Sequence, residues 1–344
     1  MAKTTVSEVA RDAGVSRATA DRVLNGRGGV SKPRERAVLE SAMRLGLDRN
    51  LNAFPATQLR VCVLMKPPHN PFYELLTQGF REANLLFGPQ AITAYVNHID
   101  VLVPAATCEM LRSVEDRYDA LVIVAPSHPA TVEALRLVSE RIPVVTLSTD
   151  LPLHVPHYYV GPDNHRAGRV AGELMGRLLG PEGGNVLLVA GLSEFSGHDE
   201  RKKGFESILA TDYPACRVSA AIETLDQNDL AAKAVATALH ADRSIRGIYN
   251  ISQDNDDITV RIDRMGVTGK LVIVCHDLTT TTRSLLRARR IDAVIDQDPI
   301  LEARRAMEAI LHHYGRWTGG PPDVSIPIQV YFRESLGTPE AQPG

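Results

Sequence analysis

Hydroxyl and carboxylate groups follow several short apolar runs of this chain. Ser148 and Asp150 come directly after a run that ends at Leu147, and Asp277 follows a run that ends at Cys275. In open α/β sheets, ligands bind beyond the carboxyl ends of the strands, so these groups can meet in one site. Buried carboxylates accept hydrogen bonds from hydroxyl groups but repel phosphates and carboxylates. These residues favour a neutral ligand rich in hydroxyl groups, although Asp150 and Asp277 could equally cap helices.

The elements that would position these groups alternate along the chain from residue 60 onward. The apolar runs are β-branched and too short to be buried helices, which predicts strands at 61–65, 120–124, 143–147, 185–189, 247–249, 271–275 and 293–295. Helical stretches separate them, for example 71–87, 129–140, 164–179, 195–210 and 299–314. This alternation predicts a doubly wound α/β body with parallel sheets.

The first fifty residues have a different pattern, that of short helices. Thr5 and Glu8 have the spacing of a capping box, Gly14 can end the first helix, and Ser16 can cap a second. A third helix follows Ser31 and ends before Gly46. Three small helices around one core predict a helix-turn-helix domain, although helix pairs of this kind also occur in proteins that never bind nucleic acid.

The distribution of charge supports contact with DNA. Residues 1–60 hold eleven Lys and Arg against six Asp and Glu, a net charge of +5, whereas the whole chain has a net charge of −3. The remainder therefore carries −8. A basic head on an acidic body is expected where only one domain meets phosphates.

Several short motifs near the N-terminus carry a resemblance to a known family. Val9-Ala, Ala13-Gly-Val-Ser16, Arg22-Val-Leu-Asn25 and Val30-Ser31 resemble the headpiece of the LacI/GalR family of transcriptional regulators. The resemblance implies a cytoplasmic homodimer that represses carbohydrate genes and binds double-stranded operator DNA. The implied DNA-binding residues are Thr5, Ser16, Arg17, Ala18, Thr19, Asp21, Arg22, Asn25, Ser31, Lys32, Arg34, Asn50 and Ala53.

The same resemblance implies a body of two lobes hinged around a ligand cleft, like periplasmic sugar-binding proteins. We expect a headpiece at 1–47, a linker or hinge at 48–60, an effector-binding and dimerisation domain at 61–337 and a flexible tail at 338–344. Crossings between lobes are expected near 160, 290 and 321, so that lobe 1 holds about 61–160 and 291–320 and lobe 2 holds 161–290 and 321–337. The implied effector-binding residues are Asn70, Phe72, Tyr73, Ser148, Asp150, Asp199, Asn255, Asp277 and Gln297.

Two positions depart from the family pattern. Asp21 stands where the family usually has a serine that meets a phosphate. A carboxylate there costs DNA affinity unless Arg17 or Arg22 pairs with it or it accepts from a cytosine amino group, so we expect an unusual operator sequence. Ala56 stands at the leucine position of the family's hinge helix, and Pro55 precedes it. Proline removes a backbone donor inside so short a helix, so we expect no leucine wedge in the minor groove and a weaker kink of the DNA, with a stiff extended linker as the alternative.

Composition limits the other function classes. No apolar run reaches the ~20 residues of a membrane span, and the chain starts without a signal segment. The four cysteines have no metal-binding spacing, and no nucleophile elbow or phosphate-binding glycine loop occurs, so neither a cofactor nor an enzyme is predicted. Where some sugar binders have an arginine, this chain has Asp199, which also favours a neutral sugar, a sugar alcohol or an amino sugar. A solute-binding transport protein and a corepressor-type regulator with a nucleobase effector are the alternatives.

Overall fold

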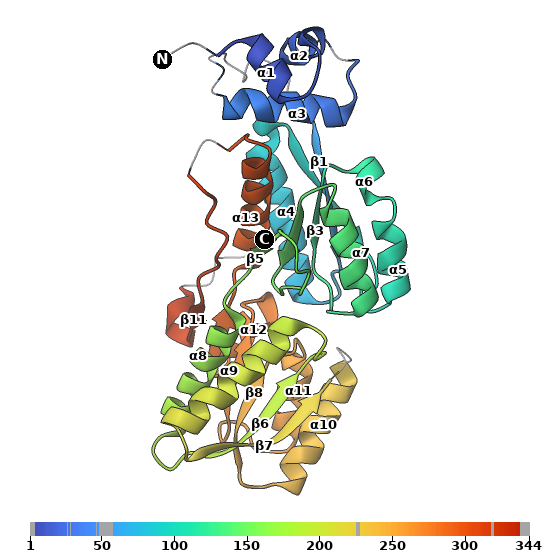
Figure 1. Cartoon of the computed structure of the whole chain (residues 1–344). Coiled ribbons are helices and arrows are strands. Elements are labelled where there is room, and N and C mark those ends of the chain that lie inside the picture. Colours follow the sequence, from blue (N-terminus) through green and yellow to red (C-terminus); the bar gives the residue numbers. More distant parts are fainter. Residues whose placement is uncertain are drawn as a thin grey trace, which may run out of the picture.

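The computed structural model describes residues 4–25, 27, 29–45, 47, 58–224, 228–317 and 320–337. A small helical head lies at one end of an elongated molecule, and two α/β lobes follow it in line (Figure 1). The lobe nearer the head is called lobe 1 and the farther one lobe 2. The predicted fold class, a helix-turn-helix headpiece on a bilobal α/β body, is confirmed.

The head consists of α1 (Val6–Asp12), α2 (Arg17–Leu24) and α3 (Lys32–Arg44). Both predicted caps are present, because the Thr5 side chain accepts from the Glu8 amide in a capping box and Ser16 accepts from the Thr19 amide. Gly14 has a φ of +64°, the left-handed conformation that lets the chain turn between α1 and α2. The side chains that the three helices bury together are those of Val9, Ala10, Ala20, Leu24, Val38, Ala42 and Leu47.

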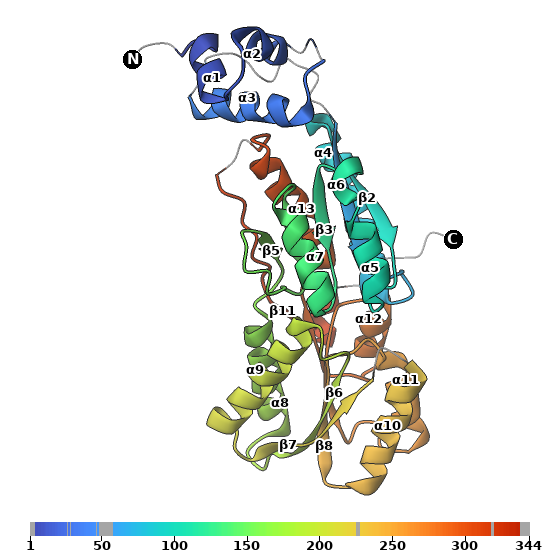
Figure 2. The same cartoon turned by 45° about the vertical axis from the view of Figure 1, so that its right-hand side comes forward.

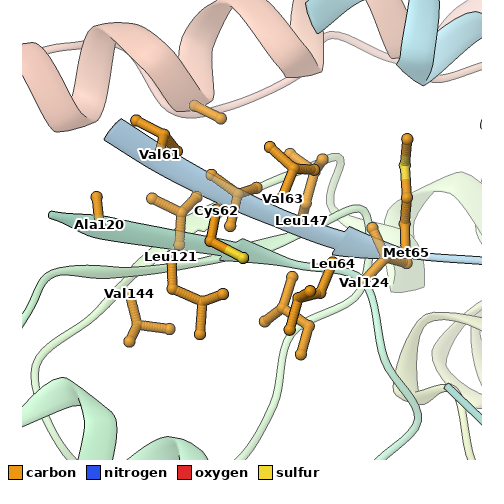
Figure 3. Close-up of a cluster of buried hydrophobic side chains, with 14 of the residues drawn as sticks. Val61, Cys62, Val63, Leu64, Met65, Ala120, Leu121, Val124, Val144 and Leu147 are labelled. Carbon is orange, nitrogen blue, oxygen red and sulfur yellow. The ribbon is translucent and has the colours of Figure 1, made fainter. Parts of the chain in front are cut away.

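Lobe 1 contains a five-stranded parallel sheet in the order β2-β1-β3-β4-β5. The strands are β1 (Leu59–Met65), β2 (Ile92–His98), β3 (Ala120–Ile123), β4 (Val144–Leu147) and β5 (Tyr158–Val160). Helices α4 (Pro71–Phe87) and α13 (Pro299–His313) pack together on one face, and α5 (Pro104–Leu111), α6 (Val114–Arg117) and α7 (Pro129–Ser139) lie on the other (Figure 2). Side chains of β1 therefore enter the core on both faces of the sheet, as Figure 3 shows.

Lobe 2 contains a six-stranded sheet in the order β11-β10-β9-β8-β6-β7. The strands are β6 (Gly184–Ala190), β7 (Cys216–Glu223), β8 (Ile245–Asn250), β9 (Val272–His276), β10 (Ala293–Asp296) and β11 (Gln329–Tyr331). The helices are α8 (Asn164–Leu179), α9 (Ser196–Asp212), α10 (Asn228–Ala241), α11 (Asn255–Arg264) and α12 (Thr280–Arg287). The prediction of parallel pairing needs one correction, because β11 runs antiparallel to β10 at the sheet edge.

The chain crosses between the lobes after β5, after β10 and before β11. The second crossing was predicted near 290, but β10 pairs with β9, so it lies after Asp296. The third was predicted near 321, but Ile326 belongs to the core of lobe 1 and Ile328 packs on lobe 2. Both errors have one cause. The lobe to which a segment belongs is decided by the sheet with which it pairs or the core in which it packs, and the positions of the segments along the sequence do not reveal this.

Helices α8 and α9 approach each other closely, and glycines make this possible. A Cβ atom added to Gly168 would lie 2.0 Å from the carbonyl oxygen of Arg201, and one added to Gly204 would lie 1.9 Å from that of His165. The two backbones therefore touch where α9 enters the space between the lobes.

We predict that Gly168→Ala lowers the free energy of unfolding by about 1–3 kcal/mol, because the new methyl group must push α9 away. Gly88→Ala is the matched control, since a Cβ atom there meets nothing within 4 Å and its φ is an ordinary −50°. Thermal melting of the purified variants measures the effect. Equal stability of Gly168→Ala and the wild type would show that α8 and α9 do not depend on this contact.

Candidate functional site

A cleft lies between the two lobes at the carboxyl ends of their strands. Lobe 1 lines it with Asn70, Phe72, Tyr73, Val124, Ser148 and Thr149, and lobe 2 lines it with Phe195, Gly197, His198, Arg201, Ile251, Ser252, Gln253, Asp277 and Gln297. Six of the nine predicted effector-binding residues are thus brought together: Asn70, Phe72, Tyr73, Ser148, Asp277 and Gln297.

The lobe 1 wall starts at the N-terminus of α4. The Asn70 Oδ1 atom accepts from the Phe72 amide at 2.9 Å and caps the helix, so the remaining polar group of this side chain is an NH2 donor. The Phe72 and Tyr73 rings meet edge to face, with centroids 5.3 Å apart. This wall offers a hydrogen-bond donor beside aromatic surface, a combination suited to the polar and C–H faces of a small molecule.

The lobe 2 wall is built around Arg201, whose side chain is only 4% exposed. Its Nε donates to Asn164 Oδ1 at 2.7 Å and one terminal nitrogen donates to Gln297 Oε1 at 2.8 Å. Gln297 in turn donates to Asp277 Oδ1 at 2.7 Å. Among the described residues, no carboxylate oxygen lies within 4 Å of the guanidinium, so amide groups connect the cation to Asp277.

Asp277 is the carboxylate of the cleft. It is 2% exposed, and the side-chain amides of Gln297 and Gln253 both donate to it. Burial raises the pKa of Asp277, while the charge of Arg201 and the two amide hydrogen bonds work against that rise. Arg201 and Asp277 together leave the cleft with balanced charge.

Ser148 and Asp277 occupy corresponding positions in the two lobes. Each follows an inner strand of its sheet, β4 for Ser148 and β9 for Asp277. The amide of each donates to a carbonyl of the neighbouring strand, that of Val160 in β5 and that of Ile295 in β10. Each also has a left-handed backbone, with φ of +62° and +66°. A residue other than glycine is strained in this conformation, and such strain is concentrated at functional sites.

Three predicted effector-binding residues do not line the cleft. Asp150 accepts from Thr146 Oγ1 and pairs with His157, Asp199 forms an ion pair with Lys203 at 2.6 Å, and Asn255 accepts from Asn250 inside lobe 2. In each case the polar group is already engaged in a hydrogen bond or ion pair with a side chain nearby in the sequence. Asp199 was one ground for expecting a neutral ligand. Because it does not line the cleft, that expectation now depends on Arg201 and Asp277, which do.

Thr149, Phe195, His198, Arg201, Ser252 and Gln253 line the cleft but were not predicted. A signal existed for Arg201, because it stands four residues before the buried Phe205 and so shares its helix face. The others lie on loops or at helix starts, where periodicity gives no information.

A short chain of hydroxyl groups joins the lobes at the rim of the cleft. The Gly197 amide donates to Thr149 Oγ1, the Thr149 and Ser196 hydroxyls lie 2.8 Å apart, and Ser196 donates to the Asp150 carbonyl. The Ser196 hydroxyl has already given its one proton to the Asp150 carbonyl. The Thr149 hydroxyl must therefore donate to Ser196 Oγ. Leu192 and Phe195 of lobe 2 are buried in the core of lobe 1, which closes the lobes on this side.

A second hollow lies at the opposite, amino edge of the lobe 2 sheet, near Arg246, Lys270, Arg289 and Asp292. Ligands of open α/β sheets bind at the carboxyl ends of strands. Two of the charged side chains there are also already engaged, Arg290 with Asp263 and Arg246 with the Gly183 carbonyl. The cleft between the lobes is therefore the better candidate.

The head presents the predicted DNA-binding residues around α2. Arg17, Ala18 and Arg22 are exposed, as are Thr5, Ser31 and Arg34. Ser16 caps α2, and its hydroxyl lies 2.8 Å from that of Thr19. Asn50, Ala53 and the Pro55-containing linker lie outside the described residues, as does the Lys32 side chain.

Asp21 of α2 has two polar partners in the head. It accepts from Asn25 Nδ2 at 2.9 Å, and its Oδ2 atom lies 3.7 Å from Arg27 Nη1. Asn25 stands four residues after Asp21, so the two side chains share one face of the helix. The carboxylate thus holds two polar side chains at the C-terminal end of α2.

The comparisons with known proteins agree with this architecture. Residues 61–315 match the periplasmic binding protein domain, and residues 5–50 match the lacI family of bacterial regulatory proteins. The body is thus a periplasmic binding protein domain, a class defined by two lobes around a cleft. The chain belongs to the lacI family of bacterial regulatory proteins, with such a domain as its body.

Individual relatives are more distant. The chain is 27% identical over 212 residues to the HTH-type transcriptional regulator DegA of Bacillus subtilis, a match that covers 60% of this chain and 61% of DegA. It is 26% identical over 249 residues to the ribose operon repressor of Halalkalibacterium halodurans, covering 72% and 71% of the two chains. A solute-binding protein from Burkholderia graminis, solved with D-arabinose, has the same fold with a TM-score of 0.75, 21% identity and coverage of 83% and 99%.

Other classes of site have no support in the described part of the chain. No three His, Cys, Asp or Glu side chains gather there as metal ligands would, and no described helix is long and apolar enough to cross a membrane.

The Asp150 and His157 pair predicts how stability depends on pH. The hydrogen bond between Asp150 Oδ1 and His157 Nε2, at 2.9 Å, raises the pKa of His157 above 6.5. The pair therefore stabilises the fold fully below pH 6.5, and the effect is lost as the pH rises through the raised pKa of His157. At the acid end it is lost below the pKa of Asp150, which His157 and Thr146 hold below 3.8 against the opposing effect of burial.

We predict that the melting temperature of His157→Gln falls furthest below that of the wild type near pH 5.5, and that the two converge in alkaline buffer. His312→Gln, at an exposed position of α13, is the control. A gap that does not change with pH would mean that the charge on His157 has no part in the pair.

Proposed function

We propose that this protein is a DNA-binding transcriptional repressor of carbohydrate genes whose grip on its operator is controlled by a small neutral effector in the interlobe cleft. One observation carries the proposal: a single chain joins an exposed basic helix-turn-helix head to a two-lobed cleft. A solute-binding transport protein would need the cleft but has no use for the head. The cleft acts by binding its effector and does not transform it.

The effector is a neutral sugar or sugar alcohol. Arg201 and Asp277 balance each other, so a ligand with its own charge would leave one charge buried without compensation. The remaining groups, on Asn70, Ser148 and Gln253, are neutral donors and acceptors of the kind that hydroxyl groups satisfy. The D-arabinose in the solved relative and the ribose in the name of the curated one support this ligand class.

A homodimer would place two heads on the two halves of a palindromic operator. The surface that supports this lies on lobe 1, where Leu85 and Leu86 of α4 and Tyr95 of the edge strand β2 are exposed. Closure of the cleft would then change the angle at which the two linkers leave the lobes, which couples effector binding to DNA binding.

The proposal is tested by selecting bound sequences from random duplex DNA with the full chain and measuring affinity by fluorescence anisotropy. We expect a palindromic sequence whose affinity falls with a log–log salt slope of about −0.9 per phosphate contact. A thermal-shift screen of sugars and polyols identifies the effector, which should weaken DNA binding by roughly 5- to 150-fold.

Two variants separate the parts of this test. Arg17→Ala should lose DNA affinity and keep the thermal shift caused by the effector. Gln297→Leu should keep DNA affinity and lose the thermal shift. Arg177→Ala, on the surface of lobe 2, is the control and should change neither. Selection of no preferred DNA sequence would overturn the proposal. Preferential binding of sugar phosphates over their parent sugars would overturn the ligand class.

A further inference from the structure

Glu302 is a completely buried carboxyl group directly behind the cleft. It lies in the first turn of α13, which starts where the chain has just crossed from lobe 2 into lobe 1, and its exposed fraction is 0%. The hydroxyl of Ser148, a residue that lines the cleft, donates to one of its oxygens, Oε2, if Glu302 is ionised. The direction of this bond can reverse if Glu302 is protonated, because the carboxylic acid then has its own proton to donate. Glu302 thus reaches the ligand space through one other side chain.

The surroundings of Glu302 are poor for a negative charge. Its second oxygen, Oε1, is buried and has no hydrogen-bond partner, and no Lys, Arg or His nitrogen among the described residues lies within 4 Å. Glu308 on the same helix shows the contrast, because Arg304 Nε donates to it at 2.8 Å. An ionised carboxylate needs such partners when it is buried, and Glu302 has a single hydroxyl.

On balance, the surroundings of Glu302 raise its pKa and so favour the protonated form. Burial raises the pKa of Glu302 well above its usual value, and the negative charges of Asp277 and Asp296 add to this rise. The hydrogen bond with Ser148 and the charge of Arg201 oppose it without overcoming it. The neutral acid is therefore the form consistent with the geometry.

Ser148 has only its hydroxyl left to respond to a ligand. Its amide donates to the Val160 carbonyl, and its own carbonyl accepts from Asn164 Nδ2 at 3.0 Å. A hydroxyl has one proton, so the direction of the bond with Glu302 decides what Ser148 offers to the cleft. If Glu302 took that proton, Ser148 could only accept from a ligand.

We infer that Glu302 is a positioning residue that remains protonated and donates to Ser148 Oγ, so that the Ser148 hydroxyl points its proton into the cleft as a donor. This deepens the proposed function, on which the ligand part of the inference rests. Lobe 1 then presents a donor at Ser148, and lobe 2 presents an acceptor at the corresponding position, Asp277. A ligand must offer an acceptor oxygen to one lobe and a hydroxyl to the other, which selects for orientation as well as composition.

The protonation state is tested by infrared difference spectroscopy of the full chain near neutral pH, without any ligand. Subtracting the spectrum of Glu302→Gln from that of the wild type should reveal the carbonyl band of a protonated carboxylic acid, and Glu308→Gln should not remove it. Ser148→Ala, which keeps Glu302 in place, should shift the same band because its hydrogen bond is gone. A carboxylate band in place of the acid band would overturn the inference.

The effect on binding is tested by calorimetry with D-arabinose as the probe. Glu302→Gln keeps an N–H donor for Ser148 and should bind within about threefold of the wild type, whereas Glu302→Met should bind about tenfold more weakly, the worth of one hydrogen bond. Equal affinity of Glu302→Met and the wild type would contradict the positioning role. If D-arabinose binds to neither, the sugar proposal is weakened, and the infrared result alone decides the state of Glu302.

Discussion

The burial of the Arg201 charge between the two lobes is the constraint on which the site depends. A guanidinium that is 4% exposed must have its donors satisfied, and here side-chain amides from the first crossing and from the second supply the acceptors. Asn164 starts α8 just after the chain enters lobe 2, and Gln297 lies where the chain leaves it. The cation therefore holds together the two segments about which the lobes would move.

The close packing of α8 and α9 makes this position of Arg201 possible. Gly168 and Gly204 let the helix backbones touch, so the N-terminal turn of α9 reaches into the space between the lobes. Ser196 and Gly197 of the same turn bond with Thr149 across the rim. The N-terminal part of α9 thus supplies both the cation of the cleft and the contact with lobe 1. A ligand that alters the position of Arg201 or of this contact would therefore alter the arrangement of the two lobes.

The sequence predicted the central elements of the fold more reliably than its edges. Strands β1, β3 and β9 are continuous apolar runs because they are covered on both faces, and α4 matched its predicted bounds at Pro71 and Phe87. The four strands that were missed, β2, β5, β7 and β11, are the outer strands of the two sheets. Their side chains are only partly buried or alternate in burial, so no apolar run marks them.

The predicted site residues show a similar division. Ser148 and Asp277, which directly follow inner strands, line the cleft as predicted. Asp150 and Asp199 instead bond with side chains nearby in the sequence, and the spacing of residues does not predict such local partners.

The central claim, that the effector binds around Arg201 and Asp277, is tested most directly by hydrogen–deuterium exchange with and without the sugar that gives the largest thermal shift. Bound ligand should slow exchange of the backbone amides around Ser148, at the start of α9 and around Asp277, on both lobes at once. Slower exchange confined to the loops around Lys270 and Arg289, at the far edge of lobe 2, would place the effector in the other hollow and contradict the account.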